Sequence, residues 1–264
     1  MHHFVLTSIA GARLNCASVE RGQQETSVSE GTMGIVNMGV PTGIVLELAR
    51  LHRATAFVET GTFHGTTTRW ASDHFEIVHT IERAQGLYDL HSQELAKIEG
   101  VTPHLGDSRD VLPQIVRELG DRRAVHWLDG HWSGGETAGE SDECPLLDEL
   151  RCLSGRADDI LLIDDARLFM SAPPPPHEPA QWPTTAEICD ALPRAAKRPI
   201  VQIIDDVIFV VPDEEALRHR LVTYAQDRAK TFWEEFGRLQ RGRSSPAARW
   251  NRLLTKVKRR MAAG

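Results

Sequence analysis

The sequence lacks several features that would place it in a specialised class of protein. Its 264 residues include four cysteines without a Cys-x-x-Cys spacing, so no disulfide framework is expected and the reducing cytoplasm is the predicted setting. No run of about 18 apolar residues is present, so no transmembrane segment is expected, and the start Met1-His2-His3 lacks the pattern of a signal peptide. The net charge of −7 argues against general binding of nucleic acid.

The remaining composition is that of an ordinary globular protein, with 41% hydrophobic and 25% charged residues. The length suits one α/β domain with extensions. We expect an N-terminal arm or lid over residues 1–41, a ligand-binding domain over 42–212 and a helical extension over 213–264. The segment from Arg238 to Arg260 is rich in Arg and Lys, which indicates a solvated amphipathic helix or, as an alternative, a contact with a membrane surface or partner. A homo-oligomer is left open.

Apolar runs alternate with helical patterns along the middle of the chain. The runs occupy 56–60, 77–81, 101–105, 124–128 and 159–163, and the helical patterns occupy 66–73, 86–98, 110–119 and 144–153. Such alternation predicts a parallel sheet covered by helices. Two further runs, 199–204 and 207–211, flank Asp205-Asp206 and predict an antiparallel hairpin. The predicted fold class is α/β: a doubly wound, Rossmann-like, mostly parallel seven-stranded sheet with a terminal antiparallel hairpin and helices on both faces.

A glycine turn follows the first of these runs. Gly61 and Gly65 carry no Cβ, so the backbone there can approach a ligand closely. Glu82 stands about twenty residues further on, at the end of the next run, where a carboxylate can accept hydrogen bonds from both hydroxyls of a ribose. Further acids end the later runs at Asp107, Asp129 and Asp164, and ligands bind at this edge of such sheets. The sequence therefore predicts a site for an adenosine-containing cofactor.

These residues resemble the motifs of class I S-adenosylmethionine-dependent methyltransferases. Glu59-x-Gly61-x-x-x-Gly65 is similar to their first motif, with Phe63 at the place of the usual middle glycine, and Gly106-Asp107-Ser108 is similar to the acidic turn that faces the adenine. The resemblance covers about residues 55–212. It implies S-adenosylmethionine as the cofactor, bound by Glu59, Thr60, Gly61, Thr62, Phe63, Gly65, Thr66, Glu82, Asp107, Ser108, Asp129 and His131.

A narrower resemblance is to the metal-dependent O-methyltransferases of the catechol type and of the sugar and antibiotic-tailoring type. It rests on Trp127-Leu128-Asp129-Gly130-His131-Trp132 together with Ile163-Asp164-Asp165, and it implies a Mg²⁺ ion held by Asp129, Asp164 and Asp165. Two departures stand out. Ser133-Gly134-Gly135 replaces the base lysine of the catechol type, and His131 occupies the place of an Asp in the sugar type. We expect His131 and Asp129 to be the catalytic residues, with His131 as the base.

Structural roles remain open for several of these residues. Asp107 suits the N-cap of a helix, Asp164 or Asp165 could pair with Arg167, and His131 could be a structural histidine. The loops 133–143 and 170–183 are expected to shape the acceptor pocket.

The predicted function is methyl transfer from S-adenosylmethionine to a hydroxyl of a small molecule or sugar, with Mg²⁺ assistance. A metal-independent or N-directed methyltransferase is one alternative. An NAD-dependent oxidoreductase and a non-catalytic cofactor-binding module are the others.

Overall fold

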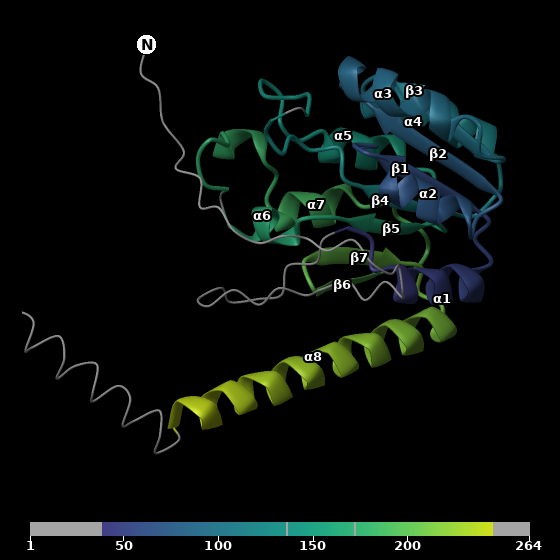
Figure 1. Ribbon diagram of the computed structural model, residues 1–264. Helices are drawn as coiled ribbons and strands as arrows, with labels where there is room; N and C mark the ends of the chain where they lie inside the picture. Colours follow the sequence, from purple (N-terminus) through teal and green to yellow (C-terminus); the bar gives the residue numbers. More distant parts are fainter. Residues whose placement is uncertain (1–38, 136, 172, 245–264) are drawn as a thin grey trace, which may run out of the picture.

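The computed structural model describes residues 39–135, 137–171 and 173–244, and these form a sheet flanked by helices (Figure 1). The strands are β1 (Ala56–Thr60), β2 (Ile77–Glu82), β3 (Val101–Leu105), β4 (Ala124–Leu128), β5 (Ile160–Ile163), β6 (Ile200–Ile204) and β7 (Val207–Val211). The helices are α1 (Thr42–His52), α2 (Thr66–Ser72), α3 (Gln85–Leu95), α4 (Ser108–Leu119), α5 (Leu146–Cys152), α6 (Ala166–Met170), α7 (Thr185–Ala191) and α8 (Glu215–Ser244), with a short 3₁₀ turn at Pro179–Gln181.

The seven strands lie in the order β3-β2-β1-β4-β5-β7-β6. The first five strands run parallel, and β7 pairs antiparallel with both β5 and β6. The chain reverses its direction of winding between β1 and β4, and a crevice for ligands opens at such a switch point, outside the carboxyl ends of the strands. The predicted fold class, including the terminal antiparallel hairpin, is confirmed.

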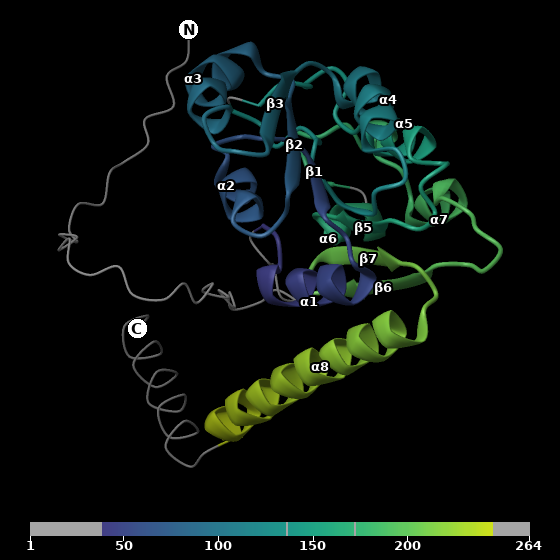
Figure 2. The ribbon, with the colours of Figure 1, turned by 90° about the vertical axis from the view of Figure 1, so that its right-hand side faces the viewer.

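Helices cover both faces of the sheet, as Figure 2 shows. On one face α1, α2 and α8 pack with the inward side chains of the strands in a core that includes Phe57 and Phe209. On the other face α5, α6 and α7 enclose a second core around Leu150 and Leu161, and α4 closes a third beside Val58. The five residues of β1 are all buried, as are those of β4, because strands covered on both faces have no side open to water.

The hairpin between β6 and β7 is closed by the two-residue turn that the sequence predicts. Ile204 pairs with Val207, and the intervening Asp205 and Asp206 have φ angles of 48° and 73°. Positive φ at both turn residues is the geometry of a type I′ turn, and aspartate tolerates it better than most residues do. Asp206 also accepts a hydrogen bond from the backbone N–H of Arg167, so the turn is tied to the start of α6.

The predicted helices are present with boundaries that shift by at most three residues. A helix not expected from the sequence, α6, follows β5 directly, where a long loop was predicted. The predicted domain 42–212 begins with α1 and ends just after β7, and α8 lies in the predicted extension. The predicted arm 1–41 falls almost wholly outside the described residues and stays a prediction. No helix among the described residues is long and apolar enough to cross a membrane.

Candidate active site

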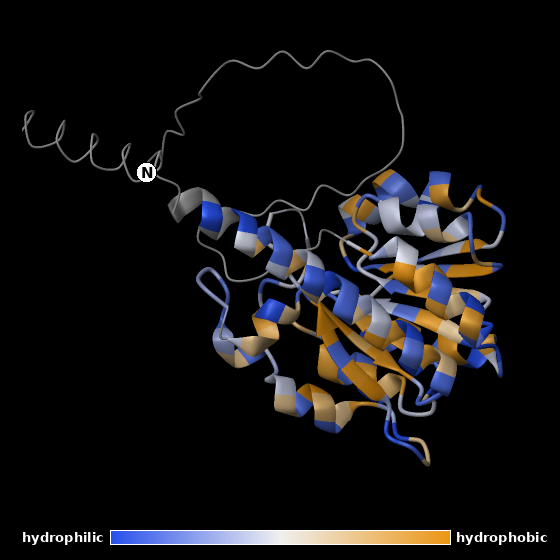
Figure 3. Cartoon of the chain, turned by 90° about the horizontal axis from the view of Figure 1, so that it is seen from below, coloured by the Kyte–Doolittle hydropathy of each residue, from blue (hydrophilic) through white to orange (hydrophobic). Residues whose placement is uncertain are grey.

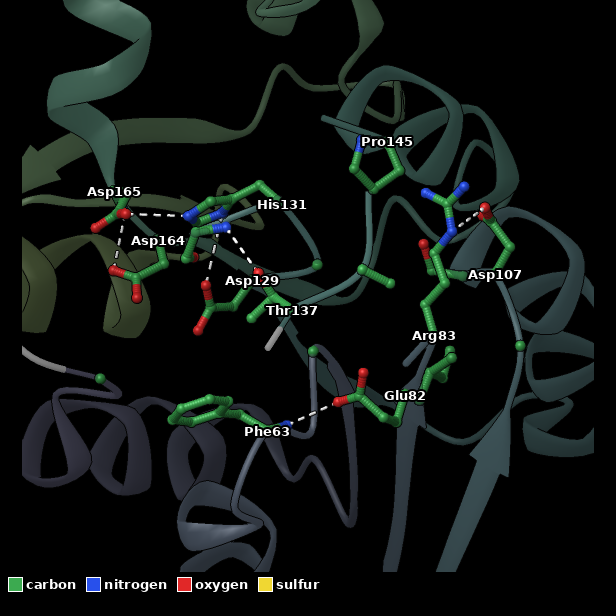
Figure 4. Close-up of a pocket in the computed structure, with 18 of the residues that line it drawn as sticks. Phe63, Glu82, Arg83, Asp107, Asp129, His131, Thr137, Pro145, Asp164 and Asp165 are labelled. Carbon is green, nitrogen blue, oxygen red and sulfur yellow. Dashed lines mark hydrogen bonds and ion pairs between the residues drawn. The ribbon is translucent and has the colours of Figure 1, made fainter. Parts of the chain in front are cut away.

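A cavity of about 450 Å³ lies at the carboxyl ends of the parallel strands. Side chains from five strand ends border it, and Figure 4 shows Glu82 and Phe63 on one side and His131 with its neighbouring aspartates on the other. The size is in the range of cavities that bind small ligands. Seven of the sequence-predicted cofactor residues line the cavity: Gly61, Phe63, Glu82, Asp107, Ser108, Asp129 and His131.

The turn after β1 has space for glycine alone at its first position. Gly61 has a φ of +84°, and a Cβ built there would lie 2.3 Å from the carbonyl oxygen of Asp129. The backbone of the β1 turn and that of the β4 end are therefore in direct contact across the floor of the cavity. Phe63, at the place of the usual motif glycine, adopts a φ of 48° and leaves 47% of its surface exposed at the cavity wall. A non-glycine residue in this conformation carries backbone strain of about 1 kcal/mol.

Glu82, at the end of β2, is held rigidly by the backbone. Its Oε2 accepts a hydrogen bond from the N–H of Phe63 at 2.9 Å, and its Oε1 accepts one from the N–H of Ala84 at 2.8 Å. A carboxylate has about four acceptor positions, so two remain for a ligand. The side chain is 6% exposed and borders the cavity. This geometry suits a pair of neighbouring hydroxyls, such as those of a ribose.

Asp107, after β3, is engaged by protein groups on both oxygens. Oδ1 accepts hydrogen bonds from the backbone N–H and the Nε of Arg109, and Oδ2 accepts one from its Nη2 at 2.6 Å and lies 3.4 Å from Nε of Arg83. The hydrogen bond from Arg109 is the main reason why the pKa of Asp107 is lowered. The residue caps α4, as the structural alternative predicted. Its predicted contact with adenine stays a prediction.

The other five predicted cofactor residues, which are Glu59, Thr60, Thr62, Gly65 and Thr66, are not part of the cavity lining. Glu59 is 2% exposed, and its Oε2 accepts hydrogen bonds from Oγ1 of Thr68 and of Thr80. Burial raises the pKa of Glu59 to about 8, although these hydrogen bonds act in the opposite direction. The geometry makes Glu59 a support of the glycine turn from below, between β2 and α2.

The ends of β4 and β5 bring together the predicted catalytic and metal-binding residues. Nε2 of His131 donates a hydrogen bond to Oδ2 of Asp165 at 3.0 Å, and its Nδ1 lies 3.6 Å from Oδ1 of Asp129 (Figure 4). Asp164 accepts a hydrogen bond from the backbone N–H of Asp165 at 2.8 Å. Asp165 also pairs with Nη1 of Arg167 at 2.7 Å, which is the alternative pairing predicted from the sequence.

The acids of this cluster differ in their electrostatics. Burial raises the pKa of Asp129 to about 6. The charge of His131 acts in the opposite direction, and the charge of Asp165 adds to the increase. Burial and the charges of Asp129 and Asp165 raise the pKa of Asp164 well above its ordinary value. Burial would also raise the pKa of Asp165, but His131 and Arg167 outweigh it and the pKa is lowered. Burial lowers the pKa of His131, yet its aspartate neighbours more than compensate and the net direction is upward.

The predicted Mg²⁺ ligands do not fit the ion in this arrangement. One oxygen of Asp165 accepts a hydrogen bond from His131 and the other accepts one from Arg167, and the positive charge of Arg167 would repel a cation placed between the three carboxylates. Across the described part of the chain, no group of three or more His, Cys, Asp or Glu side chains is arranged to hold a metal ion. The sequence placed three carboxylates at one point correctly, but the structure compensates their charge with a histidine and an arginine.

A second cavity, of about 470 Å³, adjoins the first and shares His131, Ser133, Asp165 and Arg167 with it. The two loops that the sequence predicts to form the acceptor pocket border it through Ser133, Ser171, Pro173, Pro174 and His177. This part of the prediction is a matter of position, and the identity of any acceptor stays open.

Glu143 joins the loops 133–143 and 170–183 through hydrogen bonds, a role that the sequence did not predict. Its buried carboxylate accepts hydrogen bonds from Nδ1 of His177 at 2.9 Å, from Nε1 of Trp182 at 2.6 Å and from the backbone N–H of Glu178 at 2.8 Å. Burial would raise the pKa of Glu143, but these donors outweigh it and the pKa is lowered. The ring of Trp182 in turn packs edge-on against His131, with centroids 5.4 Å apart.

A second residue that sequence reasoning missed is Glu149 of α5, which lies beneath the cavity. Its Oε1 has no hydrogen-bond partner among the described residues, and a Cβ on Gly130 would come within 3.0 Å of it. Burial raises the pKa of Glu149 to about 7. The only signal in the sequence is an acid within the apolar pattern of 144–153, which is too weak to separate a buried carboxyl from an exposed one.

No protein-family model matches the chain, and no curated protein matches it in sequence. Solved structures do match. The O-methyltransferase TomG from Streptomyces achromogenes, involved in tomaymycin synthesis and solved with S-adenosylmethionine, is 19% identical, with 67% of this chain and 82% of that chain covered and a TM-score of 0.46. CalS10, an amino pentose methyltransferase from Micromonospora echinaspora involved in calicheamicin biosynthesis, is 18% identical over 46% and 47% of the chains, with a TM-score of 0.32.

A third match is the fibrillarin pre-rRNA processing protein of Methanococcus jannaschii, at 16% identity, 70% and 88% coverage and a TM-score of 0.36. Similarity at this level concerns the path of the chain and leaves substrate and reaction to the site itself. The mostly parallel seven-stranded sheet and its antiparallel β7 are those expected from the resemblance to class I methyltransferases. At the level of the fold, that resemblance is confirmed.

Proposed function

We propose that this protein is an S-adenosylmethionine-dependent methyltransferase that acts on a hydroxyl group of a small molecule or sugar. The observation that carries the proposal is the pose of Glu82. A buried carboxylate at the end of β2 is fixed by two backbone N–H groups and keeps acceptor positions on the side of the cavity. Such a carboxylate is built to accept hydrogen bonds from the paired hydroxyls of a nucleoside.

The residues around the cavity fit S-adenosylmethionine. Glu82 would hold the ribose, and the exposed ring of Phe63 offers an apolar surface beside it. Asp129 and Asp164 favour a ligand with positive charge, because a cation relieves the repulsion between buried carboxylates. A nicotinamide dinucleotide suits this site less well, since the turn lacks the Gly-x-Gly-x-x-Gly pattern that brings a pyrophosphate to the helix.

When bound, S-adenosylmethionine supplies a methyl group that is electrophilic because the sulfur is positively charged. The chain's task is to align an acceptor oxygen and to remove its proton, and alignment contributes the larger share. Asp129 is the more accessible of the two predicted catalytic side chains, at 31% exposure against 6% for His131. With a pKa of about 6, Asp129 is ionised at neutral pH and is more basic than an ordinary aspartate.

We therefore assign the proton-accepting role to Asp129 and a relay role to His131. His131 lies between Asp129 and Asp165, so a positive charge on its ring is stabilised from both sides. Asp129, Asp164 and Asp165 do not fit Mg²⁺ in this arrangement, so we propose the metal-independent alternative. The predicted cytoplasmic setting is kept as part of the proposal.

The test is calorimetric binding of S-adenosylhomocysteine to the wild type, to Glu82→Ala and to Glu99→Ala, an exposed acid that serves as the matched control. We expect micromolar binding by the wild type and the control. We expect Glu82→Ala to bind at least about tenfold more weakly, because it loses two hydrogen bonds to a charged acceptor. NAD⁺ is expected not to bind. Absence of S-adenosylhomocysteine binding by the wild type, or tighter binding of NAD⁺, would overturn the proposal.

A screen of hydroxylated and amine-bearing small molecules with labelled S-adenosylmethionine then separates O-directed from N-directed transfer. Repeating the active reaction with a chelator tests the metal-independent form. Loss of turnover with the chelator, restored by Mg²⁺, would contradict that form while leaving the methyltransferase assignment in place.

A further inference from the structure

Helix α8 divides into an inner half that packs on the domain and an outer half that leaves it. In the inner half Leu217 and Leu221 are fully buried in the core that α1 shares, and the ring of Tyr224 lies 6.3 Å from that of Phe209. Near the middle of α8, Arg228 forms an ion pair with Asp205 of the β6–β7 turn. Beyond it the helix diverges from the sheet, as Figures 1 and 2 show.

The outer half carries three large aromatic side chains that are open to solvent. Phe232, Trp233 and Phe236 are 37%, 64% and 43% exposed. Their rings contact one another, with centroids between 5.8 and 6.5 Å apart. Single exposed apolar residues are common, but a contiguous group at the free end of a helix marks a contact surface. In the view from below, the outer part of α8 is otherwise mostly hydrophilic (Figure 3).

The charge of the chain changes abruptly at this aromatic cluster. From Phe236 to Gly264 the sequence has nine Lys and Arg residues and no Asp or Glu. The rest of the chain then holds 21 basic and 37 acidic residues, a net charge of −16. Such a separation of charge indicates an anionic partner for the basic segment.

The sequence of the basic segment is also amphipathic. Trp250, Leu253, Leu254, Val257 and Met261 recur at the spacing of one helix face, and Arg and Lys fill most of the positions between them. Residues 245–264 lie outside the described part of the chain, and the pattern is one of sequence only. Basic residues on one face with tryptophan and leucine on the other are typical of helices that lie in a membrane interface.

We propose that the outer part of α8, residues 230–244, which we name the C-terminal arm, binds the surface of an anionic lipid membrane, and that the basic charge of the sequence that follows it adds to the attraction. The rings of Phe232, Trp233 and Phe236 enter the boundary between headgroups and acyl chains, where aromatic side chains are favoured. The basic residues interact with the anionic headgroups, and a diffuse negative surface needs no matched shape on the partner. A nucleic acid would account for the basic charge but not for the exposed aromatic side chains.

The experiment is co-sedimentation of the full-length protein with vesicles of phosphatidylcholine alone and with vesicles that also contain phosphatidylglycerol. We expect binding to the anionic vesicles to be at least about tenfold tighter, and to weaken at high salt. The variant F232A/W233A/F236A should bind the anionic vesicles about tenfold more weakly, since it removes the buried apolar area. The matched control is L51A/L90A/M170A, which removes three exposed apolar side chains elsewhere and should bind like the wild type.

A charge variant, R249Q/R252Q/K256Q/K258Q, should lose the preference for anionic vesicles. Circular dichroism and binding of S-adenosylhomocysteine check that each variant is folded. Equal binding to both kinds of vesicle, or anionic binding that the aromatic variant retains, would overturn the proposal. A dimer in light scattering that F232A/W233A/F236A dissociates, without vesicle binding, would instead assign the arm to a second copy. Binding to an oligonucleotide through the same residues, without vesicle binding, would assign it to nucleic acid.

Discussion

The acids at the two ends of the cavity differ in the groups that surround their carboxylates. At the ends of β2 and β3, Glu82 is fixed by two backbone N–H groups, and Asp107 is paired with Arg109, which lowers its pKa. At the ends of β4 and β5, Asp129 and Asp164 are buried close to another carboxylate, and their pKa values are raised.

This difference separates binding from chemistry. A carboxylate that is fixed by hydrogen bonds keeps its position, which is what recognition of a neutral hydroxyl pair requires. A carboxylate with a raised pKa takes up a proton more readily and attracts a cation, which suits transfer of a positively charged methyl group to an oxygen. The predictions below test this division, beginning with the largest expected effect.

Asp129→Asn should lower kcat for methyl transfer by about 10²–10⁴-fold, the usual contribution of a general base. Binding of the uncharged product S-adenosylhomocysteine should change little, because asparagine has a similar shape. Activity of the wild type should decline as the pH falls through about 6, where Asp129 takes up a proton. The measurement is steady-state turnover against pH with an acceptor found by screening, and Asp121→Asn at an exposed position is the control. Turnover close to that of the wild type would remove Asp129 from this role.

Gly61→Ala should destabilise the fold by about 2–4 kcal/mol, since it combines positive φ with a backbone clash. The added Cβ would lie 2.3 Å from the carbonyl oxygen of Asp129, so the contact between the β1 and β4 ends must open. Gly86→Ala in α3 is the control, because no atom lies within 4 Å of its added Cβ, and it should stabilise slightly. The measurement is denaturant unfolding of both variants. If Gly61→Ala lowered the free energy of unfolding no more than a surface substitution does, the contact between the β1 and β4 ends would be shown to adjust at little cost.

Glu143→Gln should cost about 1–3 kcal/mol, because both oxygens of Glu143 accept hydrogen bonds, Oε1 from the N–H of Glu178 and Oε2 from His177 and Trp182, and the NH₂ group of an amide must face at least one of these donors. Hydrogen exchange should increase in 132–143 and 177–182, whereas β1 and β2 should keep their protection. Glu140→Gln, an exposed acid of the same loop, is the control. If exchange rose equally across the sheet, Glu143 would support the whole domain and not the two loops.

Asp164→Asn and Asp107→Asn should change stability by about 1 kcal/mol in opposite directions at pH 8. The folded state raises the pKa of Asp164 above its ordinary value of 3.8. The free energy of unfolding of the wild type therefore falls as the pH rises from 3.8 to the folded-state pKa. Asparagine avoids this loss, and Asp164→Asn should be the more stable protein at pH 8.

For Asp107 the pKa is lowered, so its ionised form stabilises the fold, and this contribution is lost as the pH falls through the folded-state pKa. Asp107→Asn should therefore be destabilised at pH 8 and approach the wild type in acid. The measurement is the melting temperature of both variants between about pH 3, which lies near the lower end of the usual titration range of aspartate, and pH 8. The same sign for both variants would contradict the contrast between the two ends of the cavity.

The sequence predicted several of the residues that line the cavity, because the relevant signals are local. Gly61, Glu82 and Asp129 each follow an apolar run, and parallel strands bring their ends to one edge. Whether the predicted magnesium ligands suit the ion is decided by contacts that are not local in the sequence. Whether Asp165 is open to an ion depends on His131 and Arg167, and His131 reaches it from 34 residues away. Glu143 was missed in the same way, since it belongs to a polar loop in the sequence and is buried only because Trp182 and His177 fold over it.

The sequence by itself determined the order of strands and helices, the closing hairpin and the acids at the strand ends. These features follow from the spacing of apolar residues and from turn chemistry within a few positions. Only the tertiary structure decided which acids have a positively charged partner, which loops are joined by the hydrogen bonds of Glu143 and which part of α8 does not pack on the domain. A carboxylate's charge depends on groups within a few ångströms of it, and those groups come from distant parts of the chain.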